Sequence, residues 1–259
     1  MPFKFATFTK PFTKETPDEL GKLFSTLGFD AMEFCLREGY QVQPAEAEKK
    51  LPLFVNQMKN YGIEVIGIAG PLTEPVFAGC KAAGISFIRT PVSLNQKTGF
   101  FAAVDETMKK LEPAIALATQ YGVKIGLQNH YASNINTAMG LHYIFEKYPV
   151  NALGAVWDSG SGCLAGEDPV HAISMIAGRF VMVNLKNAYY VRSNTYDNPV
   201  GKYDRIFCSG RQGMARWPVI LSSLSASGYK GPVCLAHEYS DQERLLELLK
   251  EDLAYARSL

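Results

Sequence analysis

Several patterns that would assign a function at once are missing from this sequence of 259 residues. No apolar stretch approaches the roughly 18 residues that a membrane-spanning helix needs. Lys and Arg nearly balance Asp and Glu, so the net charge is +1, and like charges do not run in blocks. This balance gives no general electrostatic attraction to nucleic acid or to a membrane surface. We therefore expect neither as a partner.

Cysteine is scarce and has no motif spacing. The five cysteines are Cys35, Cys80, Cys163, Cys208 and Cys234. An odd number of scattered cysteines without a CxxC pair indicates reduced thiols rather than a disulfide frame or a zinc site. The first twelve residues also lack the basic start and apolar run of a secretory leader. Both absences favour a cytoplasmic protein.

Short apolar runs alternate with helical patterns along the whole chain. The runs are Phe3–Phe8, Ala31–Cys35, Glu64–Ala69, Ser86–Thr90, Lys124–His130, Leu153–Gly160, Phe180–Ala188 and Gly231–Tyr239. Strands that alternate with helices of roughly 10–15 residues predict a parallel sheet. The length would also allow two smaller domains. Eight such units, with no GxGxxG after a strand, favour an α/β fold with one domain over residues 1–259: a single (β/α)₈ TIM barrel.

Helix boundaries are marked by capping residues. Thr16 and Glu19 form a predicted capping box around Pro17, and Gly28 is placed to end that helix. The later helices are predicted near Ala45–Tyr61, Thr73–Ala83, Thr98–Tyr121, Asn136–Tyr148, Asp168–Gly178, Trp217–Ser227 and Asp241–Ser258. One long connection, Asn187–Arg216, carries no such pattern. A loop of this length in a compact domain is usually functional or disordered.

Polar residues follow the last four predicted strands. Because side chains alternate along a strand, residues two apart share a face, which pairs Gln128 with His130, Asn184 with Lys186, and Ala236 with Glu238. Active sites of TIM barrels lie at the carboxyl ends of the strands. Amides and carboxylates bind hydroxyl groups, whereas His and Lys can move protons. These tips, together with Asp158, predict a site for a polyol, although polar strand ends also simply face water.

Four segments resemble the xylose-isomerase-like TIM-barrel superfamily of sugar phosphate isomerases and epimerases. They are GFDAMEF at Gly28–Phe34, WDSGSG around Asp158, NLKN at Asn184–Asn187, and the segment Ser209–Glu238. The resemblance implies a Glu near the site, here Glu33. It also implies four metal-ligand positions of the Glu, Asp, His and Glu type. These positions fall on Gln128, Asp158, Asn184 and Ala236. A register shift of two residues would move the last position from Ala236 to Glu238.

The residues at these positions are a poor set for a divalent metal. Mg²⁺ and Mn²⁺ prefer several charged oxygen ligands, and the amides of Gln128 and Asn184 carry no charge. We therefore expect no metal cofactor. A rebuilt site from Asp158, Glu238, His130 and His237 is the alternative. Without a metal, Lys186 beside Asp158 would supply the positive charge that stabilises an oxyanion.

Further residues are candidates for substrate binding. Arg89 ends a predicted strand and suits a phosphate or carboxylate, although a surface ion pair is equally consistent. Trp157 could stack on a sugar ring or pack in the core. Arg211, in the long connection, and His237, beside Glu238, complete this group.

The function predicted from the sequence is proton transfer next to a carbonyl of a small sugar, polyol or keto acid, as in an isomerase or epimerase. Lys186, His130, and Glu238 or Glu33 would carry the chemistry, with Gln128, Asp158 and Asn184 binding the substrate. A lyase reaction on a similar substrate is another possibility. The alternative is a non-catalytic barrel that binds a carbohydrate-like ligand. A homo-oligomer is compatible with either.

Overall fold

A closed barrel of parallel strands forms the centre of the computed structural model, which describes residues 3–259. Around the barrel the order is β1 (Lys4–Phe8), β10 (Pro232–Leu235), β7 (Phe180–Leu185), β6 (Leu153–Asp158), β5 (Lys124–Gln128), β4 (Phe87–Pro91), β3 (Glu64–Ala69) and β2 (Ala31–Cys35). Each strand pairs in parallel with its neighbours, and β1 pairs with both β2 and β10. The predicted (β/α)₈ TIM barrel is confirmed.

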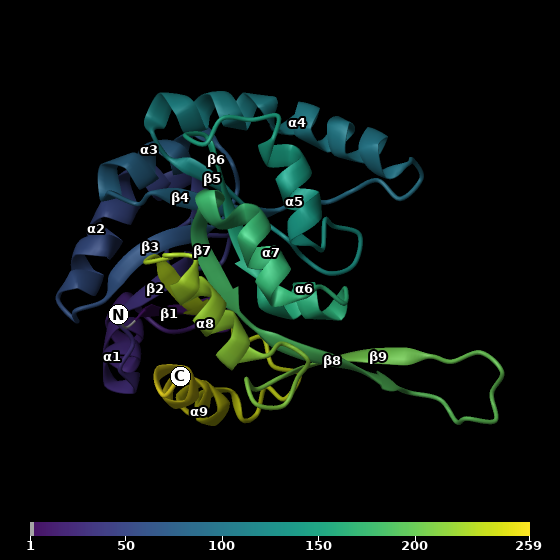
Figure 1. Ribbon diagram of the computed structural model, residues 1–259. Coiled ribbons are helices and arrows are strands. Elements are labelled where there is room, and N and C mark those ends of the chain that lie inside the picture. Colours follow the sequence, from purple (N-terminus) through teal and green to yellow (C-terminus); the bar gives the residue numbers. More distant parts are fainter. Residues whose placement is uncertain (1–2) are drawn as a thin grey trace.

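Helices surround the strands on the outside, as Figure 1 shows. They are α1 (Pro17–Leu27), α2 (Ala47–Lys59), α3 (Glu74–Ala83), α4 (Phe100–Tyr121), α5 (Ala138–Phe145), α6 (Ser159–Leu164), α7 (Pro169–Ile176), α8 (Trp217–Ala226) and α9 (Leu245–Arg257), with 3₁₀ turns η1 (Pro44–Glu46) and η2 (Ala177–Arg179). The predicted capping box at Thr16 and Glu19 is present, and Gly28 ends α1 in the left-handed conformation. Local sequence signals therefore set the boundaries of this helix.

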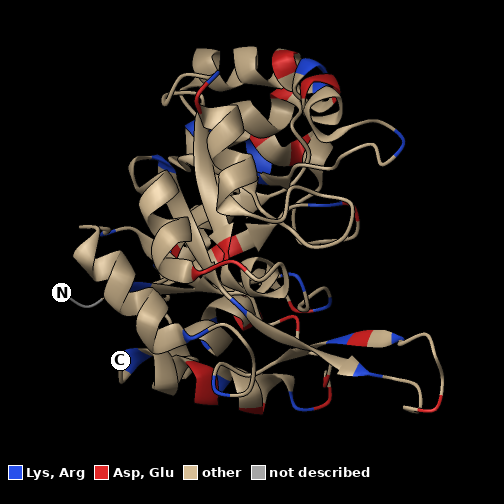
Figure 2. Cartoon of the chain, turned by 45° about the vertical axis from the view of Figure 1, so that its right-hand side comes forward, with Lys and Arg blue, Asp and Glu red and all other residues tan. Residues whose placement is uncertain are grey.

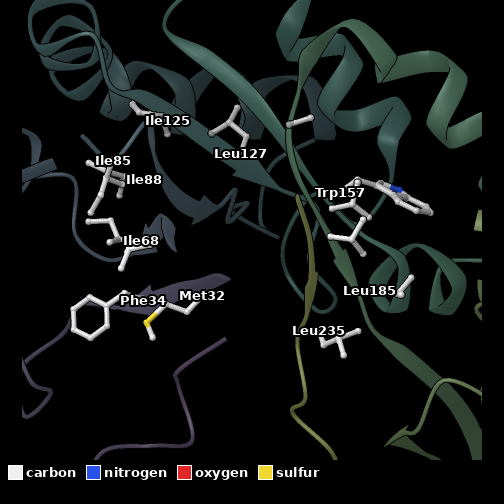
Figure 3. Packing of buried hydrophobic residues seen from close by; sticks show 14 of the residues in the cluster. Met32, Phe34, Ile68, Ile85, Ile88, Ile125, Leu127, Trp157, Leu185 and Leu235 are labelled. Carbon is white, nitrogen blue, oxygen red and sulfur yellow. The ribbon is translucent and has the colours of Figure 1, made fainter. Parts of the chain in front are cut away.

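Side chains of the strands divide between two layers. Those that point inward fill the barrel with a small apolar cluster that includes Phe8, Phe87, Val156 and Met182. Those that point outward, such as Ile88, Leu127, Leu185 and Leu235 in Figure 3, pack against the helices in a larger cluster. Alternation along each strand places polar residues two positions beyond the inner apolar ones at the carboxyl ends. This geometry builds the site described below.

The segment after β7 is not an irregular connection. It forms an antiparallel hairpin of β8 (Asn187–Arg192) and β9 (Tyr203–Cys208), which projects away from the barrel in Figure 1. The predicted strand Phe180–Ala188 is interrupted at Lys186, where β7 has ended and β8 has not begun. Within residues 3–259, the two hairpin strands pair only with each other. Their sequence therefore lacks the buried apolar run by which the barrel strands are recognised.

Charges of both signs are distributed over the molecule. In the view of Figure 2, basic and acidic segments are interspersed on the helices and along the projecting hairpin. All five cysteines are free thiols. Within residues 3–259, no helix is both long enough and apolar enough to cross a membrane.

Candidate functional site at the carboxyl end of the barrel

A chain of buried hydrogen bonds crosses the inside of the barrel from β2 to β6. The Nε of Arg89 donates to Oε1 of Glu33 at 2.5 Å, and its Nη1 donates to Oε1 of Gln128 at 2.5 Å. The Nε2 of Gln128 in turn donates to Oδ2 of Asp158 at 2.9 Å. All four side chains are at most 9% exposed. Residues from four strands thus form one connected polar unit.

Asp158 is also held from its other side. Its Oδ1 accepts a 2.7 Å bond from the backbone N–H of Ser161, so it caps the amino end of α6. Its own backbone N–H donates to Oδ1 of Asn129 at 2.7 Å. Both carboxylate oxygens are therefore engaged, which fixes the side chain against the wall of the barrel.

Lys186 and Glu238 form an ion pair at the rim. The Nζ of Lys186 donates to Oε2 of Glu238 at 2.7 Å, and Lys10, from the loop after β1, pairs with Oε1. Lys186 was expected beside Asp158, but its ion pair is with Glu238. Burial by itself would raise the pKa of Glu238, yet the two lysines lower it well below its ordinary value. Glu238 is thus a fixed carboxylate and a weak base.

Aromatic rings cover the ammonium group of Lys186. Its Nζ lies 4.1 Å from the ring centre of Phe207 and 5.6 Å from that of Tyr131. The guanidinium of Arg205 stacks on Tyr131 at 3.7 Å. Phe207 and Arg205 belong to β9, so the base of the hairpin forms part of the mouth. Cation–aromatic contacts of this kind hold positive charge in a partly dry environment.

The charged groups of the mouth influence one another's protonation. Burial raises the pKa of Glu33, and the nearby Arg89 opposes this shift without cancelling it. Burial alone would lower the pKa of Arg89, but the charge of Glu33 raises it, so the guanidinium stays protonated. Burial lowers the pKa of His130, with Asp158 and Lys186 acting in opposite directions. His130 is therefore a neutral imidazole near pH 7.

Eight of the residues proposed from the sequence meet at this mouth. They are Glu33, Arg89, Gln128, His130, Asp158, Asn184, Lys186 and Glu238. Asn184 is 1% exposed and is the register partner of Asp158 on the neighbouring strand.

The remaining three candidates lie elsewhere. Trp157 packs in the layer between strands and helices (Figure 3). Its indole N–H donates to Oε2 of Glu167 at 3.2 Å. Arg211 stacks on Tyr255 of α9 at 3.9 Å. His237 is buried next to Phe12, and its Nδ1 donates to the carbonyl of Leu235 at 2.9 Å. We leave these three residues out of the site considered below.

Comparison with models of protein families identifies the family to which this barrel belongs. The model described as xylose isomerase-like TIM barrel matches residues 22–259. The chain belongs to this family. Comparison with curated protein sequences finds no significant match.

Solved structures of the xylose isomerase-like fold superpose on nearly the entire chain. The probable 3-DHS dehydratase AsbF of Bacillus anthracis is 13% identical with a TM-score of 0.73, over 97% of this chain and 99% of that one. A D-psicose 3-epimerase of Clostridium cellulolyticum H10, solved with D-tagatose, is 12% identical with a TM-score of 0.72, over 99% of both chains. The IolI protein, solved with a zinc atom, is 17% identical with a TM-score of 0.72, over 99% and 98%. At these identities the likeness concerns the fold.

The residues of this family member do not fit a divalent metal at the four ligand positions. Gln128 already accepts from a guanidinium and donates to Asp158, whose two oxygens are both engaged. Ala236 has no donor atom. His237, one member of the alternative ligand set, turns its Nδ1 to a backbone carbonyl. Within the described part of the chain, no three His, Cys, Asp or Glu residues are grouped as metal ligands would be.

Sequence reasoning missed several residues of the mouth. Lys10 lies in a loop and reaches Glu238 across 228 positions of sequence. Tyr131 directly follows His130, and its stacking on that ring at 4.2 Å could have been anticipated from adjacency. Arg205 and Phe207 could be placed only once the hairpin was known. The pairing of segments that are far apart in the sequence leaves no local sequence pattern from which it could be predicted.

Proposed function

We propose that the mouth of the barrel binds a small polyhydroxylated carbonyl compound and moves a proton on the carbon next to its carbonyl group. The positive charge required for this chemistry comes from the side chains of Lys186 and Arg89 rather than from a divalent metal. The reaction class is that of an isomerase or epimerase.

The observation that carries this proposal is a pair of buried acceptors without a hydrogen bond. Oε2 of Glu33 and Oδ1 of Asn184 are both buried and unpaired within the described residues. A buried polar atom without a partner costs about 1–3 kcal/mol. Both atoms are acceptors, so each requires a donor, and hydroxyl groups of a polyol supply donors. Their strands, β2 and β7, lie on either side of the β1–β10 pair.

His130 is the group best suited to accept the proton. It is neutral near pH 7 because burial lowers its pKa, and a neutral imidazole is a competent general base. Its Nδ1 lies 3.3 Å from the carbonyl oxygen of Tyr131, which orients the ring. We assign it the removal of a proton from the carbon next to the carbonyl. The bonding electrons then move to the carbonyl oxygen and form an enediolate.

Lys186 stabilises that enediolate. Its side chain is 3% exposed and its ammonium group lies against the ring of Phe207, so its field is little weakened by water. Glu238 orients the ammonium group through the 2.7 Å ion pair. Return of the proton from His130 to the neighbouring carbon, as the enediolate hydroxyl passes its proton to the former carbonyl oxygen, gives an isomer. An epimer forms when His130 releases the first proton to solvent and a solvent proton reaches the carbon from its other face.

Solved relatives of the fold support this reaction class, because one of them is a D-psicose 3-epimerase solved with D-tagatose. The test is hydrogen exchange at the carbon next to the carbonyl. EDTA-treated protein is incubated in D₂O with D-tagatose or D-fructose, and deuterium incorporation is followed by NMR. We expect incorporation that His130→Gln abolishes and that His142→Gln, on the exposed side of α5, leaves unchanged.

The outcome separates the two candidate functions. A ketose that binds without any deuterium incorporation would contradict the catalytic proposal and favour a non-catalytic carbohydrate-binding barrel. Exchange that requires an added divalent ion would contradict the proposed source of positive charge.

A further inference from the structure

Two side chains of the hairpin strand β9 reach the mouth of the barrel. Arg205 and Phe207 are two positions apart, so they lie on the same face of the hairpin. Phe207 lies against the ammonium group of Lys186, whereas Arg205 lies against the ring of Tyr131. Tyr131 in turn contacts His130, the proposed proton acceptor. One strand of the hairpin therefore contacts Lys186 directly and reaches His130 through Tyr131.

Tyr131 stands between Arg205 and His130 in a stack of three flat groups. The ring centres of Tyr131 and His130 are 4.2 Å apart, with an angle of 30° between the rings. The guanidinium carbon of Arg205 is 3.7 Å from the centre of the same Tyr131 ring. Two groups this close to one ring centre would overlap on a single face, so they occupy opposite faces. Pressure on one face of Tyr131 is thus transmitted to His130 on the other.

The contacts that hold Arg205 are made with aromatic rings. Besides Tyr131, its guanidinium lies 5.3 Å from the ring centre of Phe207. Its Nε is buried and has no hydrogen-bond partner in the described part of the chain. A guanidinium is attracted to the faces of aromatic rings, and more strongly where water is excluded. Stacking therefore sets the place of Arg205 in the mouth.

The turn that carries Tyr131 has a strained backbone. Ala132 has a φ of 63°, and within residues 3–259 it is the only residue other than glycine with a positive φ. This left-handed conformation is unfavourable for a residue with a Cβ and persists only where surrounding contacts enforce it. Here Nδ2 of Asn134 donates to the carbonyl of Tyr131 at 2.7 Å, and the backbone N–H of Tyr131 donates to Oγ of Ser161 at 3.2 Å. The turn thus holds Tyr131 beside His130.

The imidazole of His130 needs such support to accept a proton from a fixed position. Rotation about the Cβ–Cγ bond of histidine has only broad preferences, so packing must select one orientation of the ring. Contacts of Nδ1 with the carbonyl oxygen of Tyr131 at 3.3 Å and with Nδ2 of Asn134 at 3.4 Å restrain one edge. The stack on Tyr131 restrains one face. A misplacement of about 1 Å at a reacting group lowers a rate about 100-fold.

We propose that Arg205 is a positioning residue for His130 and acts through the ring of Tyr131. This inference rests on the proposed function and adds the hairpin to it. Arg205 influences the rate without itself accepting the proton. With Phe207 against Lys186, strand β9 then fixes the proton acceptor and the group that stabilises the enediolate relative to each other.

The first test measures kcat and KM of deuterium exchange into D-tagatose by EDTA-treated protein. Arg205→Met removes the flat charged group and keeps the side-chain length, and Tyr131→Leu removes the ring. We expect each variant to lower kcat at least about tenfold and to leave KM nearly unchanged. Tyr131→Phe retains the ring and should keep the wild-type rate. Arg192→Met, a matched change at the tip of the same hairpin, should keep it as well.

A second readout follows the ring of His130 without turnover. Protons held over an aromatic ring give NMR signals that this ring shifts upfield. The chain has four histidines, and the signals of His130 are those missing from the spectrum of His130→Gln. We expect upfield-shifted signals in the wild type and in Tyr131→Phe, and signals near their ordinary positions in Arg205→Met and Tyr131→Leu. Melting temperatures of the same variants show that each is folded.

The outcomes separate this inference from the proposed function. Either an unchanged kcat or wild-type His130 signals in Arg205→Met overturns the positioning role. A raised KM at unchanged kcat also overturns it, because Arg205 would then bind the substrate itself. If the wild type exchanges deuterium into no ketose and the His130 signals still move in Arg205→Met, the hold of the hairpin on His130 stands and the catalytic proposal falls.

Discussion

Arg89 and Glu33 place an ion pair inside the barrel, where few charged side chains are found. Taking two charges out of water is costly, and the attraction between them offsets this cost only when further hydrogen bonds satisfy both groups. Gln128 provides one such bond, and two atoms of the pair have no hydrogen-bond partner in the described part of the chain. Removing either partner would leave a buried charge, so a single substitution here reports on folding as much as on function. Substitutions of residues at the rim are therefore better tests of function.

Replacing Lys186 tests the proposed source of positive charge. Lys186→Met should lower the rate of deuterium exchange by about 100-fold, the loss typical when one stabiliser of a developing oxyanion is removed. Lys186→Arg should also impair exchange, because a planar fork does not replace a compact ammonium group. The rate and the melting temperature are measured on the same variants.

Lys10→Met is the matched control, because Lys10 also pairs with Glu238 but is 42% exposed. It should keep most of the exchange rate, with Lys186 still holding Glu238. If Lys186→Met lowers only the melting temperature and leaves exchange and ligand affinity unchanged, Lys186 merely neutralises Glu238.

His237 makes the stability of the fold depend on pH and is not part of the site. Burial lowers its pKa from an ordinary 6.5 to about 4, so the folded protein holds it neutral while the unfolded chain takes up a proton. Its contribution to stability is therefore complete above pH 6.5 and is lost as the pH falls toward 4, by at most about 3 kcal/mol.

Comparing His237→Gln with the wild type by denaturant unfolding isolates this contribution. The difference is needed because burial raises the pKa of Asp252 to about 6, which acts in the opposite sense over the same range. The variant should be less stable than the wild type at pH 7, and the gap should narrow toward pH 4. A gap that is constant with pH would contradict a neutral buried His237.

At the scale of elements, the hairpin links the surface to the mouth. Its tip is ordered by Arg192, whose Nη2 donates to the carbonyl of Asn198 at 2.9 Å, while Tyr196 is 86% exposed. Its base carries Phe207 against Lys186. The hairpin therefore has an outer part in solvent and an inner part that belongs to the site.

Shortening one side chain at the base tests this division. Phe207→Ala should let water reach the ammonium group of Lys186 and lower ligand affinity about tenfold, since such contacts are worth about 1–2 kcal/mol when desolvated. Calorimetry with D-tagatose or D-fructose measures the effect. Tyr196→Ala at the tip is the control and should bind as the wild type does. Equal behaviour of the two variants would contradict the assignment of the base to the site.

The elements also show where sequence reasoning succeeds. The predicted strand Ala31–Cys35 coincides with β2, because it is buried throughout and bounded by turn residues. The hairpin was missed because its strands are stabilised by each other and by few core contacts, so apolar periodicity is weak. The short helix α6 was missed because its six residues, SGSGCL, have low helix propensity and depend on the cap from Asp158.

At the scale of the whole molecule, strand order predicted the site better than any single motif. Alternation along parallel strands predicted Gln128, His130, Asn184, Lys186 and Glu238 at one mouth with Asp158, and the family resemblance added Glu33. It could not reveal that Arg89 turns into the barrel, because a strand-end arginine fits a surface ion pair as well. Nor could it place Lys10 or Phe207, whose contacts join segments far apart in sequence.

The central claim is that side chains, not a bound metal, supply the positive charge of this barrel. Titration of EDTA-treated protein with Mn²⁺ or Zn²⁺, together with elemental analysis after dialysis, tests it most directly. We predict far less than one equivalent of retained metal, because the ligand positions hold Gln128, Asn184, Ala236 and an Asp158 whose two oxygens are already bonded. One stoichiometric ion that survives dialysis and is lost in Asp158→Asn would contradict the account.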